Sequence, residues 1–168
     1  MDLPLVLIGL LGAGKTSIGS KLAAKLDLDF YDMDQLIEVR TGQSVTSFFA
    51  SQGERKFREM ESGILSELIV KEKSVIATGG GAVLSPQNRA LLKERAFCIC
   101  LDVDVDTLYQ RLKNDDTRPL LQGTDLKHRL QELKTQREAY YQECAHLIIH
   151  TQEKSMAQII DEVVEQLG

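Results

Sequence analysis

The residues with the clearest chemical meaning lie near the N-terminus, in the segment GLLGAGKT at positions 9–16. It fits the pattern G-x-x-x-x-G-K-[ST], between an apolar run and a helical pattern, which is the context that a phosphate-binding loop (P-loop) requires. Its glycines let backbone N–H groups turn inward around an anion, and the following helix adds partial positive charge. A glycine-rich turn that binds nothing is the alternative. We expect a loop that binds ATP through Gly12, Ala13, Gly14, Lys15, Thr16 and Ser17.

Two side chains of this loop have specific roles in that chemistry. Lys15 is expected to reach the β- and γ-phosphates, and the hydroxyl of Thr16 is expected to ligate Mg²⁺.

The length and the missing motifs narrow the class of P-loop protein. No N-K-x-D motif for guanine recognition occurs, and 168 residues are too few for a large motor ATPase. The size suits a kinase that acts on a small metabolite or a nucleoside monophosphate.

The elements that must position this loop alternate between strand and helix, which predicts a parallel sheet wrapped by helices. Strands are expected at 5–8, 30–31, 74–78, 97–101 and 147–149, and helices at 15–25, 34–70 (two or three, broken at Gly42 and Gly53), 85–95, 105–112 and 125–144, with a last helix opened by Ser155 and Gln158. Residues 113–124 lack periodicity and are expected to form an exposed loop or lid. We expect one domain over residues 1–168.

The polar and glycine residues of this pattern follow the strands. The first strand leads into the phosphate loop, the second into Asp32 and Asp34, and the third into Gly79–Gly81. Because ligands of open parallel sheets bind beyond the carboxyl ends of the strands, these groups are expected to meet at one edge.

The two aspartates have a functional and a structural interpretation. Asp34 can accept a hydrogen bond from an attacking hydroxyl and take its proton late in the transfer, and Asp32 can hold a water on the magnesium. Alternatively, both simply lead the next helix, where acids are favoured. Asp102 and Asp104 are expected to cap the helix that follows them.

Five further motifs carry a resemblance over nearly the whole chain. Asp32 and Asp34 form D-x-D, residues 57–61 form F-R-x-x-E, and 78–82 hold a glycine triplet. Residues 118–121 read RPLL, and 137–141 form R-x-x-Y-Y. In this order and spacing they resemble the shikimate kinase family. The resemblance implies a P-loop NTPase-like α/β fold of three layers (α/β/α), with a five-stranded parallel sheet in the order 2-3-1-4-5.

The resemblance also implies an activity: phosphorylation of the 3-hydroxyl of shikimate by ATP with Mg²⁺, on the route to chorismate and aromatic amino acids. It places Asp34, Arg58, Gly79, Gly80, Gly81 and Arg137 at the substrate, and Lys15, Asp34 and Arg118 in catalysis. Arg118 is expected to fold over the nucleotide within a lid at 113–124, and Arg111 to lie against the adenine. Helices at about 33–61 are expected to move when substrate binds.

The residues alone leave the roles of the two substrate arginines open. Arg58 has Glu54 at i−4 and Glu61 at i+3 and can pair with them on a helix face, and Arg137 can merely cover apolar surface. In the functional interpretation both guanidinium groups bind a substrate carboxylate, and Glu61 holds Arg58 in place.

Composition limits the remaining function classes. The net charge of −5 argues against a duplex nucleic-acid binder. Cys98 and Cys100 lie in an apolar run and are expected to be buried thiols, although a metal pair is the alternative. The start of the chain lacks a basic signal-like region and no apolar run nears about 18 residues, so we expect a cytoplasmic protein without membrane partners. We also expect a monomer.

Two other functions compete with this interpretation. Another small-acid kinase, such as a gluconate kinase, would share the phosphate loop, but the F-R-x-x-E and R-x-x-Y-Y motifs argue against it. A non-catalytic binding module derived from a kinase would be expected to lose Lys15, Asp34 or an arginine, and all of them are present.

Overall fold

The computed structural model describes residues 3–114 and 125–168. Five parallel strands form one sheet in the order β2-β3-β1-β4-β5, which confirms the predicted fold. The strands are β1 (Leu5–Ile8), β2 (Asp29–Asp32), β3 (Ser74–Ala77), β4 (Phe97–Asp102) and β5 (Leu147–His150). Each lies within one or two residues of its predicted position.

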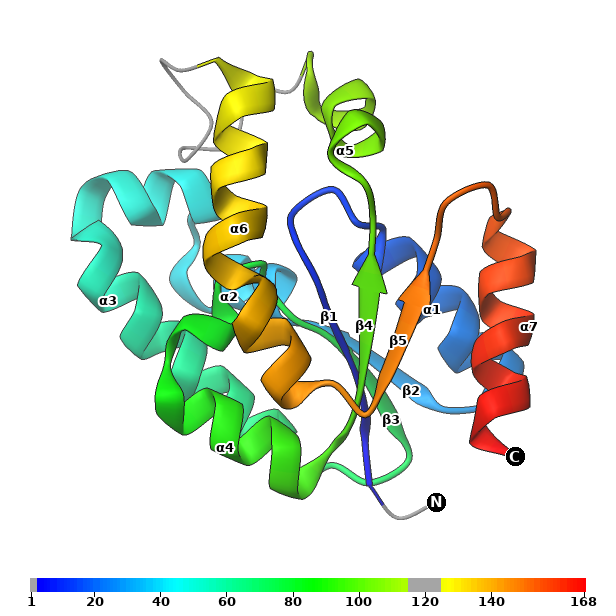
Figure 1. The fold of residues 1–168 in the computed structure, drawn as a ribbon. Helices are drawn as coiled ribbons and strands as arrows, with labels where there is room; N and C mark the ends of the chain where they lie inside the picture. The colour runs from blue at the N-terminus through cyan, green and yellow to red at the C-terminus, as the bar shows by residue number, and fades with distance from the viewer. Residues whose placement is uncertain (1–2, 115–124) are drawn as a thin grey trace.

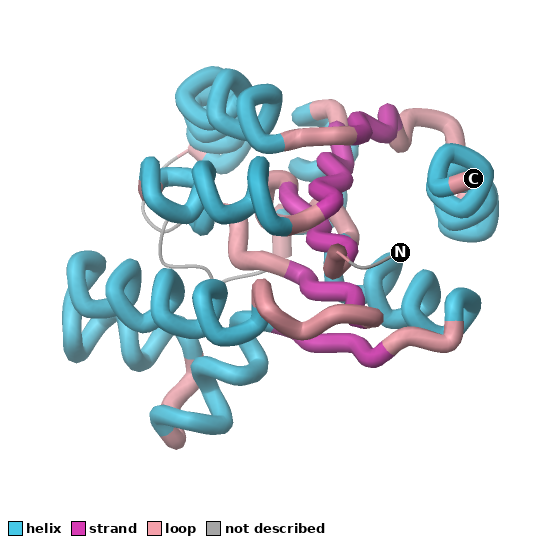
Figure 2. Tube along the Cα trace, turned by 90° about the horizontal axis from the view of Figure 1, so that it is seen from below, coloured by secondary structure: helices cyan, strands magenta, loops and turns pink. Residues whose placement is uncertain are grey.

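Helices cover both faces of the sheet, giving three layers (Figures 1 and 2). One face carries α1 (Lys15–Leu26) and α7 (Met156–Leu167), and the other carries α3 (Val45–Leu68), α4 (Pro86–Arg95) and α6 (Leu126–Cys144). Two shorter helices lie near the upper edge of the sheet: α2 (Met33–Thr41), packed against α3, and α5 (Val105–Leu112), packed against α6. A 3₁₀ turn at Ala82–Leu84 links β3 to α4.

Burial explains why the central strands read as continuous apolar runs. All four residues of β1 and of β3 are buried, since helices cover both faces of a parallel sheet. The edge strand β2 is only partly buried. The thiols of Cys98 and Cys100 are buried in β4, as predicted.

Helix ends form where the local sequence predicted them. Ser85 caps α4, with Pro86 as its first residue, and Ser155 and Gln158 form the expected capping box of α7. Gly42 ends α2 with φ +69°, and Gly53 interrupts α3 with φ +84°. Both values lie in the left-handed region that favours glycine, so the predicted breaks are confirmed.

The expected lid at 113–124 lies outside the described residues except for its first two positions. Among the residues that are described, no helix has the length and apolar character needed to cross a bilayer.

Candidate active site

The phosphate loop joins β1 to α1 at the carboxyl edge of the sheet. Gly12 and Gly14 adopt φ +80° and +93°, which explains why glycine occupies both positions. The side chain of Lys15 is buried, and its Nζ donates hydrogen bonds to the carbonyl oxygens of Gly9 at 2.6 Å and Leu10 at 2.9 Å. These bonds hold the ammonium group across the loop.

Helix α5 closes one side of the loop. Arg111 donates from Nη1 to the carbonyl oxygen of Gly12 at 2.8 Å. A Cβ at Gly12 would come within 3.0 Å of the Leu112 side chain, so this helix packs closely against the loop backbone. The structure therefore places Arg111 beside the nucleotide-binding residues predicted from the sequence.

The predicted magnesium residues lie in contact. The hydroxyl of Thr16 donates to Oδ2 of Asp32 at 2.5 Å, while Oδ1 of Asp32 accepts from the backbone N–H of Gln35 at 3.2 Å. Asp32 is the N-cap of α2, which confirms the structural interpretation of this aspartate. A hydroxyl and a carboxylate are hard oxygen ligands, a donor set that suits Mg²⁺.

This donor set is sparse. Within residues 3–114 and 125–168, no group of three or more His, Cys, Asp or Glu side chains could hold a metal ion. Magnesium at this point would take most of its ligands from phosphate oxygens and water, as is usual in kinase sites.

A second cluster of charge forms around Arg58, on the C-terminal half of α3. Its Nη1 donates to Oε1 of Glu61 at 2.9 Å, and its Nε lies 3.7 Å from Oε1 of Glu54. Both pairings foreseen on the helix face are present. Glu61 is almost fully buried, and burial raises its pKa, although the neighbouring guanidinium of Arg58 opposes this rise.

The glycine triplet after β3 lies directly against these charged side chains. A Cβ at Gly79 would come within 2.9 Å of Oε2 of Glu61 and 3.1 Å of Oδ1 of Asp34. A Cβ at Gly81 would overlap the guanidinium group of Arg58. The absence of side chains at Gly79 and Gly81 therefore leaves room for the carboxylates and the guanidinium group of the site.

Arg137 reaches the same triplet from α6. Its Nη1 lies 3.6 Å from the position of a Cβ on Gly80, and its side chain is buried. Burial lowers the pKa of Arg137, and the nearby charge of Arg58 adds to this lowering. A buried guanidinium near a second one favours an anion between them, because each lacks the solvation that water would supply.

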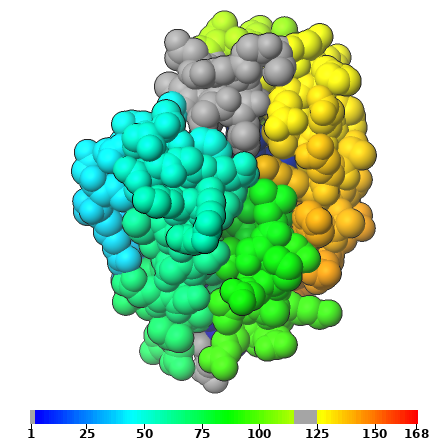
Figure 3. Space-filling model, turned by 90° about the vertical axis from the view of Figure 1, so that its left-hand side faces the viewer, coloured from blue at the N-terminus to red at the C-terminus, as the bar shows by residue number. Residues whose placement is uncertain are grey.

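The triplet also borders the phosphate loop. The backbone nitrogen of Leu11 lies 3.2 Å from the position of a Cβ on Gly80. Asp34, Arg58 and Arg137 therefore gather around Gly79–Gly81, next to the loop that carries Lys15. Figure 3 shows the surface between α3 (cyan) and α6 (yellow to orange), with blue atoms of the N-terminal part of the chain visible at the bottom of a hollow.

Comparison with known proteins identifies this arrangement. The model of the shikimate kinase family matches residues 11–168. The shikimate kinase of Ralstonia nicotianae is 44% identical over 160 residues, which cover 95% of this chain and 84% of the relative. That of Symbiobacterium thermophilum is 40% identical over 165 residues, covering 97% and 95%. The chain belongs to the shikimate kinase family.

Solved structures of the family superpose closely on this chain. The shikimate kinase of Acinetobacter baumannii, in complex with shikimate, has a TM-score of 0.95 at 35% identity and covers 99% of this chain and 93% of its own. A sugar kinase from Janibacter sp. has a TM-score of 0.67 at 14% identity, a likeness that shows the shared fold alone. Because the chain belongs to the shikimate kinase family, the competing gluconate kinase hypothesis is set aside.

Sequence reasoning missed an aromatic cluster in this shikimate kinase family member. The ring of Phe57 lies 6.4 Å from that of Phe48 and 5.5 Å from that of Phe49, and Arg58 lies over the Phe57 ring at 5.2 Å. The cluster packs the two halves of α3 on either side of Gly53. The adjacent phenylalanines Phe48 and Phe49, which precede this glycine in the sequence, were the signal from which the cluster could have been predicted.

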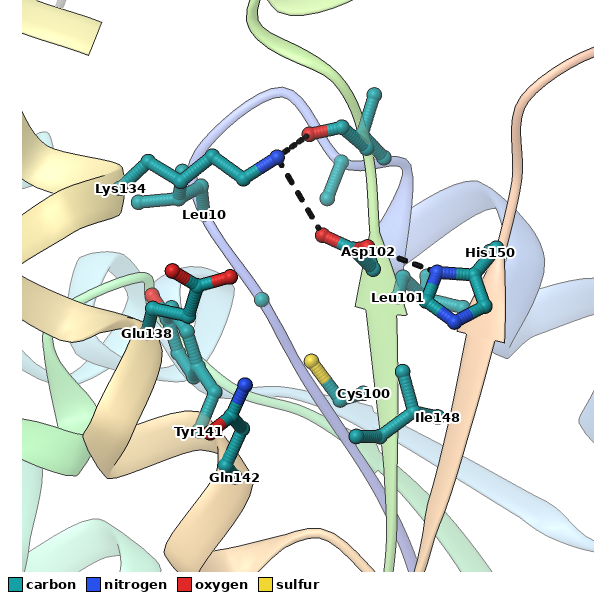
Figure 4. Close-up of a pocket in the computed structure, with 13 residues that line it drawn as sticks. Leu10, Cys100, Leu101, Asp102, Lys134, Glu138, Tyr141, Gln142, Ile148 and His150 are labelled. Carbon is teal, nitrogen blue, oxygen red and sulfur yellow. Dashed lines mark hydrogen bonds and ion pairs between the residues drawn. The ribbon is translucent and has the colours of Figure 1, made fainter. Parts of the chain in front are cut away.

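A pocket of about 110 Å³ lies between α6 and strands β4 and β5, and Gly9, Leu10 and Ala13 of the phosphate loop also line it (Figure 4). Across it, Lys134 Nζ lies 3.6 Å from Oδ1 of Asp102, and Oδ2 of Asp102 lies 2.8 Å from Nδ1 of His150. Asp104 caps α5 as predicted, but the prediction for Asp102 was wrong, because its carboxylate faces these two side chains instead. Asp34, Arg58 and Arg137 do not line this pocket.

The predicted site residues fall into two groups, according to whether the structure describes them. Arg118 lies outside the described residues. The other predicted site residues lie either in the phosphate loop, beside it, or around the glycine triplet.

Proposed function

We propose that this protein transfers the γ-phosphoryl group of ATP to the 3-hydroxyl of shikimate, giving shikimate 3-phosphate and ADP. One observation carries the proposal: Asp34, Arg58 and Arg137 come from three helices and gather around Gly79–Gly81, beside the phosphate loop. A relative with nearly the same fold was solved with shikimate bound. The product is an intermediate on the route to aromatic amino acids.

The nucleotide side of the reaction rests on the phosphate loop. The backbone of residues 12–17 and the N-terminus of α1 would surround the phosphates, and Lys15 would exchange its carbonyl partners Gly9 and Leu10 for phosphate oxygens. Thr16 would ligate Mg²⁺ directly and Asp32 through water. When bound, the metal neutralises charge on the phosphates.

The substrate side rests on two guanidinium groups and a carboxylate. Arg58 and Arg137 would bind the carboxylate of shikimate, and Glu61 keeps Arg58 in position through its 2.9 Å hydrogen bond. Asp34 would accept a hydrogen bond from the 3-hydroxyl, orient it toward the γ-phosphate and take its proton late in the transfer.

Two further elements complete the proposal. Arg118 is assigned to the transferring phosphoryl group, whose charge it would neutralise, and Arg111 to the adenine. The helices at about 33–61 would move toward the bound substrate, with the positive-φ residues Gly42 and Gly53 at their joints. Because the described residues of the site come together within one chain, we propose that a single copy is active.

The direct test is turnover measured by coupled ADP release, with shikimate or gluconate as acceptor. We expect release with shikimate only, and a loss of at least about a thousandfold in kcat for Lys15→Met, which keeps the length of the side chain but removes its charge. Turnover of gluconate with no turnover of shikimate would refute the substrate assignment. No ADP release with either acceptor would point to a non-catalytic protein.

A further inference from the structure

A buried tyrosine on α6 holds the middle of the glycine triplet. The hydroxyl of Tyr141 donates a hydrogen bond of 2.6 Å to the carbonyl oxygen of Gly80, across 61 residues of sequence. Tyr141 is 7% exposed, and burial raises the pKa of its hydroxyl, which therefore stays protonated as a donor. Its ring forms part of the wall of the pocket in Figure 4.

This bond acts on the central peptide of a turn, which is closed by a hydrogen bond of 3.2 Å from the Ala82 N–H to the Gly79 carbonyl oxygen. Gly80 lies between two other glycines, and a glycine backbone is restricted less by its neighbours than that of any other residue. The peptide between Gly80 and Gly81 is planar and trans, so its N–H points away from its C=O. Fixing the Gly80 carbonyl toward α6 therefore directs the Gly81 N–H to the opposite side.

The same face of α6 also carries a proposed substrate residue. Arg137 lies four residues before Tyr141, one helical turn away, and its Nη1 borders Gly80. The Tyr141 hydrogen bond thus sets the distance between α6, which carries Arg137, and the glycines that face Asp34 and Arg58.

We propose that Tyr141 is a positioning residue for the acceptor substrate: it orients the Gly80–Gly81 peptide and holds Arg137 against the triplet. It does not touch the reacting atoms. The proposal rests on the proposed function, since the acceptor that it concerns is shikimate.

The adjacent tyrosine provides a matched control. Tyr140 packs its ring under the guanidinium group of Arg89, at 4.2 Å, on a different side of α6. Within residues 3–114 and 125–168, its hydroxyl forms no hydrogen bond. Phenylalanine in either position keeps the ring and removes only the hydroxyl.

The experiment compares steady-state kinetics of the full-length wild type, Tyr141→Phe and Tyr140→Phe. We expect Tyr141→Phe to raise the KM for shikimate about tenfold, because a buried carbonyl loses its donor, and to leave the KM for ATP within about twofold. Tyr140→Phe should match the wild type. An unchanged shikimate KM in Tyr141→Phe, or equal rises in both KM values, overturns the proposal.

A measurement on the wild-type sequence covers the case in which Tyr141→Phe fails to fold. Protein labelled with 3-fluorotyrosine has four ¹⁹F signals, one for each tyrosine, assigned by replacing Tyr31, Tyr109 and Tyr140 in turn. The Tyr141 signal should shift on addition of shikimate, and a signal that stays in place overturns the proposal. Failure of the wild type to phosphorylate shikimate would instead refute the proposed function.

Discussion

The guanidinium group of Arg58 lies so close to the backbone of Gly81 that even a Cβ there would overlap it. Arg58 comes from α3 and Gly81 from the turn that follows β3, so this contact joins the helix that carries one proposed carboxylate-binding residue to the glycine triplet. Arg137 borders Gly80 of the same triplet. Small changes in the triplet should therefore act on substrate binding through the arginines.

Gly81→Ala should displace the Arg58 side chain, because the guanidinium can move more easily than the backbone. We expect the KM for shikimate to rise at least about tenfold while the KM for ATP changes by less than about twofold. Gly63→Ala is the control, since Gly63 lies within α3 with nothing within 4 Å of its Cβ position. That control should keep its kinetics and gain roughly 1 kcal/mol of stability. Normal shikimate binding by Gly81→Ala would contradict the role given to Arg58.

Replacing either arginine should impair acceptor binding selectively. Arg58→Ala or Arg137→Ala should raise the KM for shikimate on the order of a hundredfold, since a charge-assisted pair with the substrate carboxylate is lost, and leave nucleotide affinity nearly intact. Arg58→Lys should recover only part of the loss, because an ammonium group lacks the planar fork. The measurement is separate titration of the two substrates. Equal losses for both would indicate a structural role.

The buried carboxyl of Glu61 predicts a pH dependence of stability. Burial raises its folded pKa above the unfolded value, so the folded state binds more protons than the unfolded state between these two values. The stability contribution of the protonated form is complete below the ordinary glutamate pKa and is lost as the pH rises through the raised pKa.

The measurement for Glu61 is urea unfolding of the wild type and Glu61→Gln across this pH range. The stability of the wild type relative to the variant should fall as the pH rises through the window. Glu59→Gln removes a carboxyl at an exposed position of the same helix and is the control for the loss of a carboxyl from α3. A difference between wild type and Glu61→Gln that is independent of pH would mean that the carboxyl does not titrate in this window.

Asp32→Asn separates the two roles of this aspartate. Asparagine is a good N-cap, so the stability of the protein should change by less than about 0.5 kcal/mol. The carboxylate that faces Thr16 is lost, so the Mg²⁺ concentration needed for half-maximal activity should rise about tenfold. Asp104→Asn, at the N-cap of α5, is the control and should leave the Mg²⁺ requirement unchanged. An unaltered requirement in Asp32→Asn would leave Asp32 with its capping role alone.

The helices, the strands and the phosphate loop could be predicted from the sequence, because their signals are local. Each of these signals depends on a few consecutive residues. They are the apolar runs of β1 and β3, the helix caps Ser85 and Ser155, and the helix breaks at Gly42 and Gly53. The strand order and the substrate residues came from motifs that resemble those of a known family, and the fold confirmed that order. That Asp34 and the glycine triplet lie at the same edge as the phosphate loop was expected because strand ends of a parallel sheet share an edge. Arg58 and Arg137 were expected there from the resemblance alone.

Which side chains meet across long sequence separations could not be predicted in this way and depends on the packing of the whole chain. Asp102 faces His150 because β4 and β5 pair in a register that sets these two residues side by side, and no local pattern specifies that register. Tyr141 reaches Gly80 because α6 packs at one particular height and rotation against the 3₁₀ turn that follows the glycine triplet. Such contacts depend on how whole elements pack, and packing is a property of the complete core.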